Sequence, residues 1–252
     1  MRILSIGNSF SQDAQYWLHR IAAANGLEME TVDLVIGGCS LETHCGHIHD
    51  GEPAYSLERN DGEWERMVSL SAGLESDRFD VITLQQASHF SGRPQTYLPY
   101  LPELAAYCRQ KQPDAALYFH QTWSYETDSD HWAFPFYNHD QREMLRRIQD
   151  ATEMAAGLIG ASLLPVGTVI QSLRDTVPEF GYKNGGLSLC RDGFHLSMDY
   201  GRFTAAAVWF RVLTDRLTCT EGFEGMEPAL LEKINAVIEQ VLTPGNGCMD
   251  FG

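Results

Sequence analysis

Short apolar runs alternate with longer amphipathic stretches along most of the chain. Each run has the length of a strand, and unbroken apolar character is typical of strands that are covered on both faces of a parallel sheet. The last run contains Pro165, which favours a position near an edge of the sheet. This pattern predicts five strands, at residues 2–6, 29–36, 80–84, 115–119 and 161–166.

Apolar residues spaced three or four positions apart predict helices between these strands. In the segment 12–25, Trp17, Leu18 and Ile21 recur with this spacing, and Gly26 is a typical helix terminator. The same criterion predicts further helices at residues 97–112, 139–160, 198–217 and 228–242.

Strands that alternate with helices form parallel sheets whose right-handed crossovers place helices on both faces. We therefore expect an α/β fold, a three-layer α/β/α sandwich with a parallel, flavodoxin-like sheet of about five strands. No repeat, linker or low-complexity tract divides the sequence, so residues 1–252 are predicted to form a single domain with a frayed, Gly-rich tail at 243–252. Active sites in such folds lie beyond the carboxyl ends of the strands.

The charge balance restricts the partners of the protein. Its 252 residues include 18 Lys and Arg against 34 Asp and Glu, for a formal net charge of −16. Such a chain repels phosphate backbones and anionic lipid surfaces, so nucleic-acid and membrane partners are not expected. No apolar run approaches the roughly 20 residues of a bilayer span. Because the first strand begins at residue 2, we expect no signal peptide and a cytoplasmic location.

The segment after the first predicted strand carries a candidate nucleophile. Ser9 follows Gly7 and Asn8, just before a predicted helix. A serine there can hold its hydroxyl at the sheet edge while its backbone N–H lies near a helix N-terminus, which suits it to stabilising negative charge. The alternative is an ordinary helix N-cap, a role for which Ser11 and Asp13 are at least as suitable.

A second motif, near the end of the chain, supplies the partners that such a serine needs. Asp192 and His195 are three residues apart in a predicted turn before a helix. The carboxylate can accept the Nδ1 proton of the imidazole and leave Nε2 as a base for a hydroxyl. Taken singly, such a histidine is more often a surface or core residue. Together the two motifs provide every role of an acyl-transfer triad, so Ser9, His195 and Asp192 are the predicted catalytic residues.

The G-x-S-x-G elbow of the α/β-hydrolases is absent. The motifs instead resemble the SGNH (GDSL-like) hydrolase superfamily, whose nucleophile follows the first strand and whose Asp and His come from one late D-x-x-H. The resemblance implies that the backbone N–H groups of Ser9 and Gly38 form an oxyanion hole. It covers residues 2–215 and indicates a branch catalogued as a domain of unknown function, on the combination of GNSFSQDA, GGCSLETH, LQQASH, HQTWSY and RDGFHLS.

The third of these blocks departs from the superfamily, in which an Asn amide after the third strand completes the oxyanion hole. Here the strand is followed by Gln85, Gln86, Ala87, Ser88 and His89. A Gln amide is chemically equivalent to an Asn amide, although its side chain is longer. Gln86 is therefore the predicted donor, with Gln85 and His89 as alternatives.

Residues after the fourth predicted strand suit a sugar, whose ring stacks on aromatic faces and whose hydroxyls bond to amides. Gln121, Trp123 and Tyr125 lie there, and together with Asn8 they are the predicted substrate-binding residues. The alternative is a loop whose Trp covers the core. The aromatic stretch that continues through residues 132–137 is a candidate lid over the site.

A run from His44 to Asp50 contains metal-ligating residue types. It has no distant partner with the spacing of a zinc site, and the six cysteines form no C-x-x-C pair. We interpret these histidines as part of the rim of the site, so neither a metal nor a cofactor is predicted.

The sequence thus predicts a serine esterase, with O-acyl (acetyl) groups on a carbohydrate or another small alcohol as its substrates. The main alternative is a carbohydrate-binding protein that kept the fold and lost turnover, since the usual Asn of the third block is missing. A metal-dependent hydrolase built on residues 44–50 is a third hypothesis. The sequence specifies neither the acyl length nor the oligomeric state.

Overall fold

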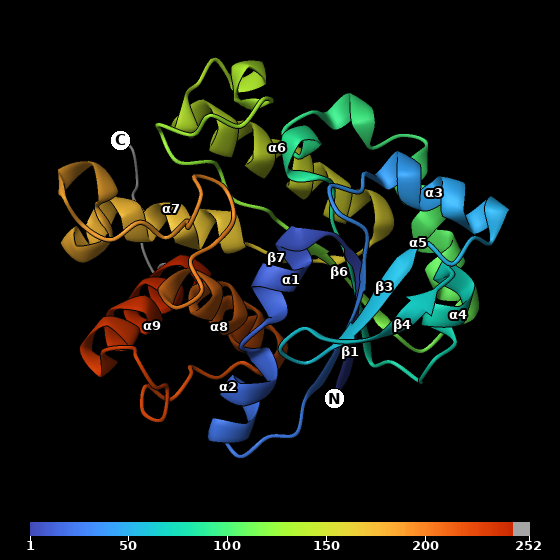
Figure 1. Cartoon of the computed structure of the whole chain (residues 1–252), viewed down its shortest axis with the longest axis horizontal. Coiled ribbons are helices and arrows are strands. Elements are labelled where there is room, and N and C mark those ends of the chain that lie inside the picture. Colours follow the sequence, from blue (N-terminus) through green and yellow to red (C-terminus); the bar gives the residue numbers. More distant parts are fainter. Residues whose placement is uncertain (244–252) are drawn as a thin grey trace, which may run out of the picture.

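The computed structural model, which describes residues 1–243, contains one sheet of seven strands (Figure 1). Five of them run parallel: β1 (Arg2–Gly7), β2 (Glu30–Val35), β5 (Val81–Leu84), β6 (Ala116–His120) and β7 (Ser162–Leu164). Their order across the sheet, β2-β1-β5-β6-β7, is the predicted flavodoxin-like order. β1 and β5 are buried along almost their whole length, as their apolar sequences predicted.

The sheet has seven strands rather than five because an antiparallel hairpin extends it beyond β2. β3 (Tyr55–Arg59) pairs with β2, and β4 (Glu63–Val68) forms the outer edge. β4 is mostly exposed, and its sequence EWERMV lacks the apolar run by which the parallel strands were predicted. The turn of the hairpin holds Asn60 and Gly62 at positive φ, a conformation that these residue types favour.

Helices on the two faces of the sheet enclose two hydrophobic cores, which confirms the three-layer arrangement (Figure 1). One core lies beneath five helices: α1 (Ser9–Gln15), α2 (Leu18–Ala24), α7 (Val166–Thr176), α8 (Tyr200–Thr214) and α9 (Pro228–Leu242). The other lies beneath α3 (Leu41–Asp50), α4 (Leu70–Leu74) and α5 (Tyr100–Lys111). α6 (Gln141–Ile159) contributes to both cores and packs against α5 and α7.

Several helices differ from the sequence prediction. The single helix expected at residues 12–25 is two helices, α1 and α2, separated by a turn at Tyr16 and Trp17. α3, α4 and α7 were not predicted at all. The first two begin after Ser40 and Ser69, whose hydroxyls accept backbone N–H groups of the first turn, a capping signal that the periodicity argument did not use.

The loops and the end of the chain complete the description. Within residues 1–243, no helix combines the length and apolar character needed to cross a bilayer. The predicted frayed tail at 243–252 lies outside the described residues except for Thr243, which follows α9. Short 3-10 helices occupy Ser88–Phe90, Pro94–Thr96, Phe134–Tyr137, Pro178–Phe180 and Tyr182–Asn184.

Candidate active site

Ser9 is the first residue of α1, directly beyond the carboxyl end of β1. Asn8 is the N-cap of this helix, because its Oδ1 accepts the N–H of Phe10 at 2.9 Å. Capping is thus supplied by the neighbouring residue, and the Ser9 hydroxyl is available for another partner. Gly7 permits the tight passage from strand to helix, since a Cβ there would lie 2.5 Å from the Ser11 hydroxyl oxygen.

The structure brings Ser9, His195 and Asp192 together in one hydrogen-bonded chain. The Ser9 hydroxyl lies 2.8 Å from His195 Nε2, and His195 Nδ1 lies 2.7 Å from Asp192 Oδ2. Asp192 Oδ1 also accepts the backbone N–H of His195 at 2.7 Å and that of Phe194 at 3.2 Å. Partial burial raises the pKa of the Asp192 carboxyl, but the hydrogen bonds from His195 outweigh this and hold the pKa below its usual value. The carboxylate is therefore ionised and fixed in position.

The sequence suggested Asp13 only as a helix cap. In the structure it holds the loop at residues 191–196, called the histidine loop below, against α1. Its fully buried carboxylate accepts the backbone N–H of Leu196 at 2.8 Å. The same carboxylate accepts hydrogen bonds from Nη1 of Arg191 at 3.0 Å and from Nε of Arg202, on α8, at 2.8 Å. These bonds join the helix that carries Ser9 to the residue next to His195. The sequence signal was a charged residue on the apolar face of an amphipathic helix.

The loop after β2 lies next to the candidate nucleophile. The Asn8 side-chain amide donates to the backbone carbonyl of Cys39 at 3.1 Å, which ties the two loops together. Gly38 in this loop is exposed and has φ +65°, a conformation that glycine adopts without strain. The N–H of Ser9 belongs to the first turn of α1, where backbone donors have no partner within the helix. Both N–H groups thus belong to segments at the same edge of the sheet.

Gln86, the predicted oxyanion donor, is buried and fully hydrogen-bonded elsewhere. Its amide nitrogen donates to the backbone carbonyl of Thr96 at 3.0 Å and to the Thr96 hydroxyl at 3.1 Å. Its Oε1 accepts the backbone N–H groups of Leu41 and Ala87. The geometry therefore gives Gln86 a structural role, joining the loops after β5 and β2, and does not direct its amide toward Ser9.

Gln85, the first alternative, supports the segment that carries Ser9. Its amide nitrogen donates to Asn8 Oδ1 at 2.8 Å, and its Oε1 lies 2.9 Å from His120 Nδ1. Because Oε1 is an acceptor, His120 carries its proton on Nδ1. Burial lowers the pKa of His120 to about 3, so this imidazole stays neutral. His120 was not singled out from the sequence, although it directly follows the apolar core of the fourth predicted strand.

The predicted substrate-binding residues beyond β6 are buried, which contradicts their contact with a substrate. Trp123 is fully buried, stacks on Phe10 with centroids 4.3 Å apart and donates from Nε1 to the carbonyl of Phe194 at 2.7 Å. Tyr125 is also fully buried, with its hydroxyl 2.9 Å from that of Ser88. The alternative of a Trp that covers the core is therefore correct.

Gln121 and Asn8 are buried as well. The Gln121 side chain is hydrogen-bonded to Thr152 and Thr168, between α6 and α7. Asn8 is only 1% exposed and makes the capping and loop contacts described above. Neither side chain presents a free polar group to a ligand, so these two predictions are corrected to structural roles.

Other aromatic residues surround the triad. Phe194 lies 4.2 Å from His195 between ring centroids, and His131 lies 4.7 Å from Phe194. Trp132 follows with 63% of its surface exposed, 5.7 Å from His131 and 5.2 Å from His89. Within the candidate lid at 132–137, Phe134 and Tyr137 belong to the core, whereas Trp132 and Phe136 are exposed. The exposed rings are the ones that can contact a substrate.

His131 has a defined protonation state. The backbone N–H of Ala133 donates to its Nδ1 at 3.2 Å, so its proton is on Nε2. Burial and the nearby His195 lower the pKa of His131 below its usual value. Next to the triad the protein thus places a neutral imidazole that can donate one hydrogen bond.

The run from His44 to Asp50 lies within α3, and its side chains do not converge on one ligand position. His44 is buried, with Nδ1 2.8 Å from the Tyr55 hydroxyl, and burial lowers its pKa to about 3. His47 bonds to Asp50, whereas His49 bonds to Glu103 on α5. Among residues 1–243, no group of three His, Cys, Asp or Glu side chains is arranged to hold a metal ion.

A protein family described as a domain of unknown function (DUF4886) matches residues 2–226. The chain belongs to the DUF4886 family. It is 36% identical to a DUF4886 protein from Bacteroides uniformis, with a TM-score of 0.86 over 96% of this chain and 94% of that one. No curated protein is significantly similar to it.

This DUF4886 chain also shares its fold with more distant structures. A protein from Slackia heliotrinireducens that is assigned to the SGNH hydrolases is 21% identical, with a TM-score of 0.57 over 84% of this chain and 98% of that one. An acetylxylan esterase from Geobacillus stearothermophilus is 11% identical, with a TM-score of 0.51 over 84% and 94%. The predicted membership of a family catalogued as a domain of unknown function is thereby confirmed, and the chain shares its fold with proteins described as SGNH hydrolases.

Proposed function

We propose that this DUF4886 protein is a serine hydrolase that cleaves carboxylic esters. The observation that carries the proposal is the continuous hydrogen-bonded chain from the Ser9 hydroxyl through His195 to Asp192. A hydroxyl at the start of a helix, an imidazole with one nitrogen on that hydroxyl, and a carboxylate on the other nitrogen are the parts of an acyl-transfer triad. Its members come from opposite ends of the chain, so their meeting is a property of the fold.

In the proposed mechanism, His195 Nε2 takes the proton of Ser9 as the hydroxyl oxygen attacks the ester carbonyl. Asp192 keeps the Nδ1 proton in place and stabilises the imidazolium that forms. His195 then gives its proton to the leaving alcohol, which produces an acyl-enzyme. Water, deprotonated by the same histidine, releases the acid and restores Ser9. These steps require no cofactor.

The developing oxyanion would be held by the backbone N–H groups of Ser9 and Gly38. Such a donor is worth about 3 kcal/mol of transition-state stabilisation when it is aimed correctly. The bond from Asn8 to Cys39 supports this pairing, because it holds the Gly38 loop beside the Ser9 segment. The side-chain donor that completes the site in other SGNH hydrolases has no counterpart in Gln86, whose amide is occupied.

The substrates we propose are O-acyl esters, such as acetyl esters, of a carbohydrate or another small alcohol. The exposed indole of Trp132, close to His131 and His89, offers a face on which a sugar ring can stack. Imidazole donors beside it can bond to sugar hydroxyls. The distant structural likeness to an acetylxylan esterase is compatible with this class.

Labelling with a serine-reactive phosphonate tests the proposal most directly. The protein should release p-nitrophenol from p-nitrophenyl acetate, and the phosphonate should abolish this activity while adding one adduct, which peptide mapping places on Ser9. Ser9→Ala should remain unlabelled, whereas Ser162→Ala, a change at an exposed serine of β7, should label normally. A folded protein that neither turns over the ester nor takes up the phosphonate would instead be a binding protein on the same fold.

A further inference from the structure

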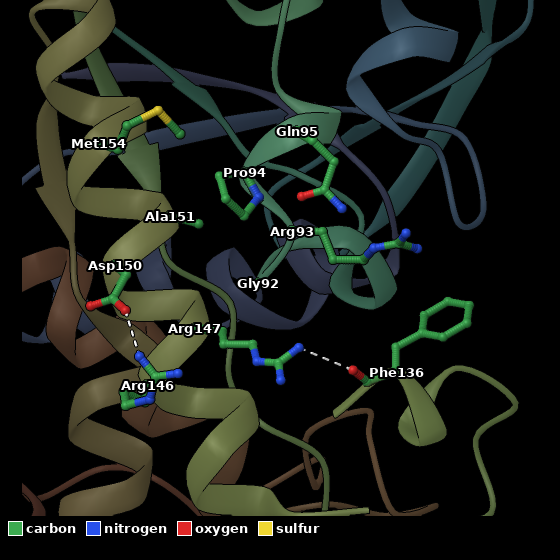
Figure 2. A pocket seen from close by; sticks show the side chains of 10 residues that line it. All are labelled: Gly92, Arg93, Pro94, Gln95, Phe136, Arg146, Arg147, Asp150, Ala151 and Met154. Atoms are coloured by element: carbon green, nitrogen blue, oxygen red, sulfur yellow. Dashed lines mark hydrogen bonds and ion pairs between the residues drawn. The ribbon is translucent and has the colours of Figure 1, made fainter. Parts of the chain in front are cut away.

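A cavity of about 660 Å³ lies between α6 and the loop at residues 92–95, next to Phe136 of the aromatic stretch (Figure 2). α6 forms one wall, with Arg146, Arg147 and Met154 facing the opening. The loop at residues 92–95, which continues from the strand end of β5, and Phe136 form the other wall. Ser9, His195 and Asp192 do not line this cavity, so the proposed mechanism leaves it unexplained.

The cavity carries one arginine whose charge is not balanced. Arg146 and Arg147 both pair with Glu143, and Arg146 also pairs with Asp150. By contrast, among residues 1–243 no carboxylate lies within ion-pair distance of Arg93. A free guanidinium is notable in a chain with a net charge of −16, where 34 acidic residues compete for 18 Lys and Arg.

The guanidinium of Arg93 is nevertheless held in place. Its central carbon lies 4.8 Å from the ring centroid of Phe136 and 5.6 Å from that of Phe90. Contacts with two ring faces orient the flat group and leave its N–H edge free. An oriented guanidinium donates two parallel hydrogen bonds to a carboxylate, with little loss of side-chain freedom on binding.

The rest of the lining suits a ring rather than a small ion. Phe136, Pro94, Ala151 and Met154 supply apolar surface, and Gln95 supplies an amide. Such a mixture of apolar area and a few polar groups is typical of a site for an organic ligand. The single unbalanced positive charge of Arg93 matches a singly charged carboxylate better than a dianionic phosphate.

A series of aromatic ring contacts connects Phe136 of this cavity with the triad. From His195 it passes through Phe194 and His131 to Trp132, whose ring lies 5.6 Å from that of Phe136 between centroids. Phe136 in turn contacts Arg93. A chain of linked sugar rings can therefore lie along these partly or fully exposed rings, with its ester at Ser9 and a more distant unit in the cavity.

We propose that the cavity is a subsite for a carboxylate-bearing ring of the substrate, and that Arg93 is the residue that binds its carboxylate. This inference rests on the proposed esterase function and narrows its substrate class to acyl esters of acidic oligosaccharides, such as chains that contain uronic acid. Arg93 acts on specificity, because it binds a group remote from the bond that breaks.

Matched substrates test the proposal. O-acetylated galacturonic acid oligosaccharides are compared with the same oligosaccharides after methyl esterification, which removes the charge and keeps the rings and acetyl groups. The parent protein should deacetylate the acidic form with a higher kcat/KM. Arg93→Gln should lower the ratio of kcat/KM for the acidic over the neutral form by about tenfold, mainly through KM, because a charge-assisted bidentate contact is lost. A ratio unchanged from that of the parent would overturn the proposal.

Two further variants separate a local effect at the cavity from misfolding of Arg93→Gln and from the general loss of a positive charge. Met154→Glu adds a negative charge at an exposed helical position in the cavity and should lower the same ratio, even if Arg93→Gln folds poorly. Arg78→Gln is the matched control, since it removes an exposed arginine that precedes β5, away from the carboxyl ends of the strands. Its ratio should equal that of the parent, and a loss as large as that of Arg93→Gln would contradict a local effect.

A binding experiment separates this inference from the proposed function. Ser9→Ala protein is titrated with unacetylated galacturonic acid oligosaccharides and with their methyl esters, and the affinities are measured by calorimetry. About tenfold tighter binding of the acidic form, lost with Arg93→Gln, supports the subsite even if no ester is hydrolysed. Equal affinities for both forms, or displacement by inorganic phosphate at far lower concentration, would reject a carboxylate site even in an active esterase.

Discussion

The carboxyl edge of the sheet has two halves that use polar side chains in opposite ways. Beyond β1, Ser9 is partly exposed and bonds to His195, a residue from a distant loop that also reaches solvent. At the ends of β5 and β6, Gln85, Gln86 and His120 are almost completely buried and bond to one another or to neighbouring loops. The first half exposes the candidate catalytic groups to solvent, and the second half holds the surrounding loops in place with buried hydrogen bonds.

The segments that lie over each strand end explain this difference. β1 runs directly into α1, so the first residue of the helix remains at the surface. The end of β6 is covered by the histidine loop, because the backbone N–H of Glu126 bonds to the carbonyl of Gly193 at 2.7 Å and Trp123 bonds to Phe194. Polar residues under such a cover must find partners inside the protein, since a buried unpaired amide is costly. A position after a strand is therefore not by itself a sign of substrate contact.

The largest effects are expected in the exposed half. Ser9→Ala and His195→Ala should each lower kcat for p-nitrophenyl acetate by about a thousandfold or more, because each removes a member of the triad. The thermal midpoint should change little, as neither side chain fills the core. Steady-state kinetics and thermal denaturation measure the two effects. Activity of Ser9→Ala within a few-fold of the parent would end the triad interpretation.

Asp13→Asn should affect both activity and stability, because Asp13 joins the helix that carries Ser9 to the loop that carries His195. The change leaves the guanidinium of Arg202, which is largely buried, without its charged partner. We expect a loss of about 3–5 kcal/mol in the free energy of unfolding. Displacement of the histidine loop should also lower kcat by about a hundredfold.

The control for Asp13→Asn is Asp114→Asn, which breaks the exposed pair with Arg78. It should cost no more than about 1 kcal/mol in urea denaturation and leave kcat unchanged. If both variants lost the same amount of stability, the cluster of Asp13 with Arg191 and Arg202 would contribute no more than an exposed ion pair.

Gln86→Ala and Gln85→Ala test whether these two buried glutamines have structural or catalytic roles. Each change should cost about 1–3 kcal/mol of unfolding free energy, since buried donors or acceptors lose their partners. Gln86→Ala should leave kcat within a few-fold of the parent, because its bonds go to Thr96 and Leu41. Gln85→Ala should lower kcat more, because Asn8 loses the amide that fixes it beside Ser9. A hundredfold loss of kcat confined to Gln86→Ala would restore its role as an oxyanion donor.

The prediction with the smallest expected effect on kcat concerns Asp33, a fully buried residue of β2 beneath α1. Its Oδ1 lies 3.0 Å from the Ser11 hydroxyl, whereas Oδ2 has no partner among the described residues. Burial, with a contribution from Glu58, raises the pKa of Asp33 well above its usual value, although the bond to Ser11 opposes the shift. The unfolded chain loses this proton near pH 4, so stability declines as the pH rises from there toward the folded pKa.

Asp33→Asn should therefore stabilise the protein, and the gain should grow with pH. Each pH unit between the unfolded and folded pKa values costs the parent about 1.4 kcal/mol, a cost that the neutral amide avoids. Thermal midpoints measured at pH 4 and at pH 8 test this, with little difference from the parent expected at pH 4. A gain that is larger at pH 4 than at pH 8 would contradict the raised pKa.

The amino-acid sequence by itself determined the parallel strands, their order and the meeting of Ser9 with His195 and Asp192. Apolar runs and periodic helices depend on neighbouring residues, so they can be read locally. The α/β rules then place the ends of parallel strands at one edge, which is why a serine after the first strand and a late D-x-x-H could be expected to meet. The hairpin of β3 and β4 was not predicted, because its exposed outer strand β4 lacks the apolar run by which the parallel strands were recognised.

Only the tertiary structure decided which polar residues at that edge face solvent. Gln86, Gln121 and Trp123 are buried because loops from elsewhere in the chain cover them. No local sequence pattern indicates that these loops will do so. The same holds for charge. Whether Asp13 is a cap or an ion-pair centre, and whether Arg93 has a carboxylate beside it, follows from long-range packing, because electrostatic partners act through space and not along the sequence.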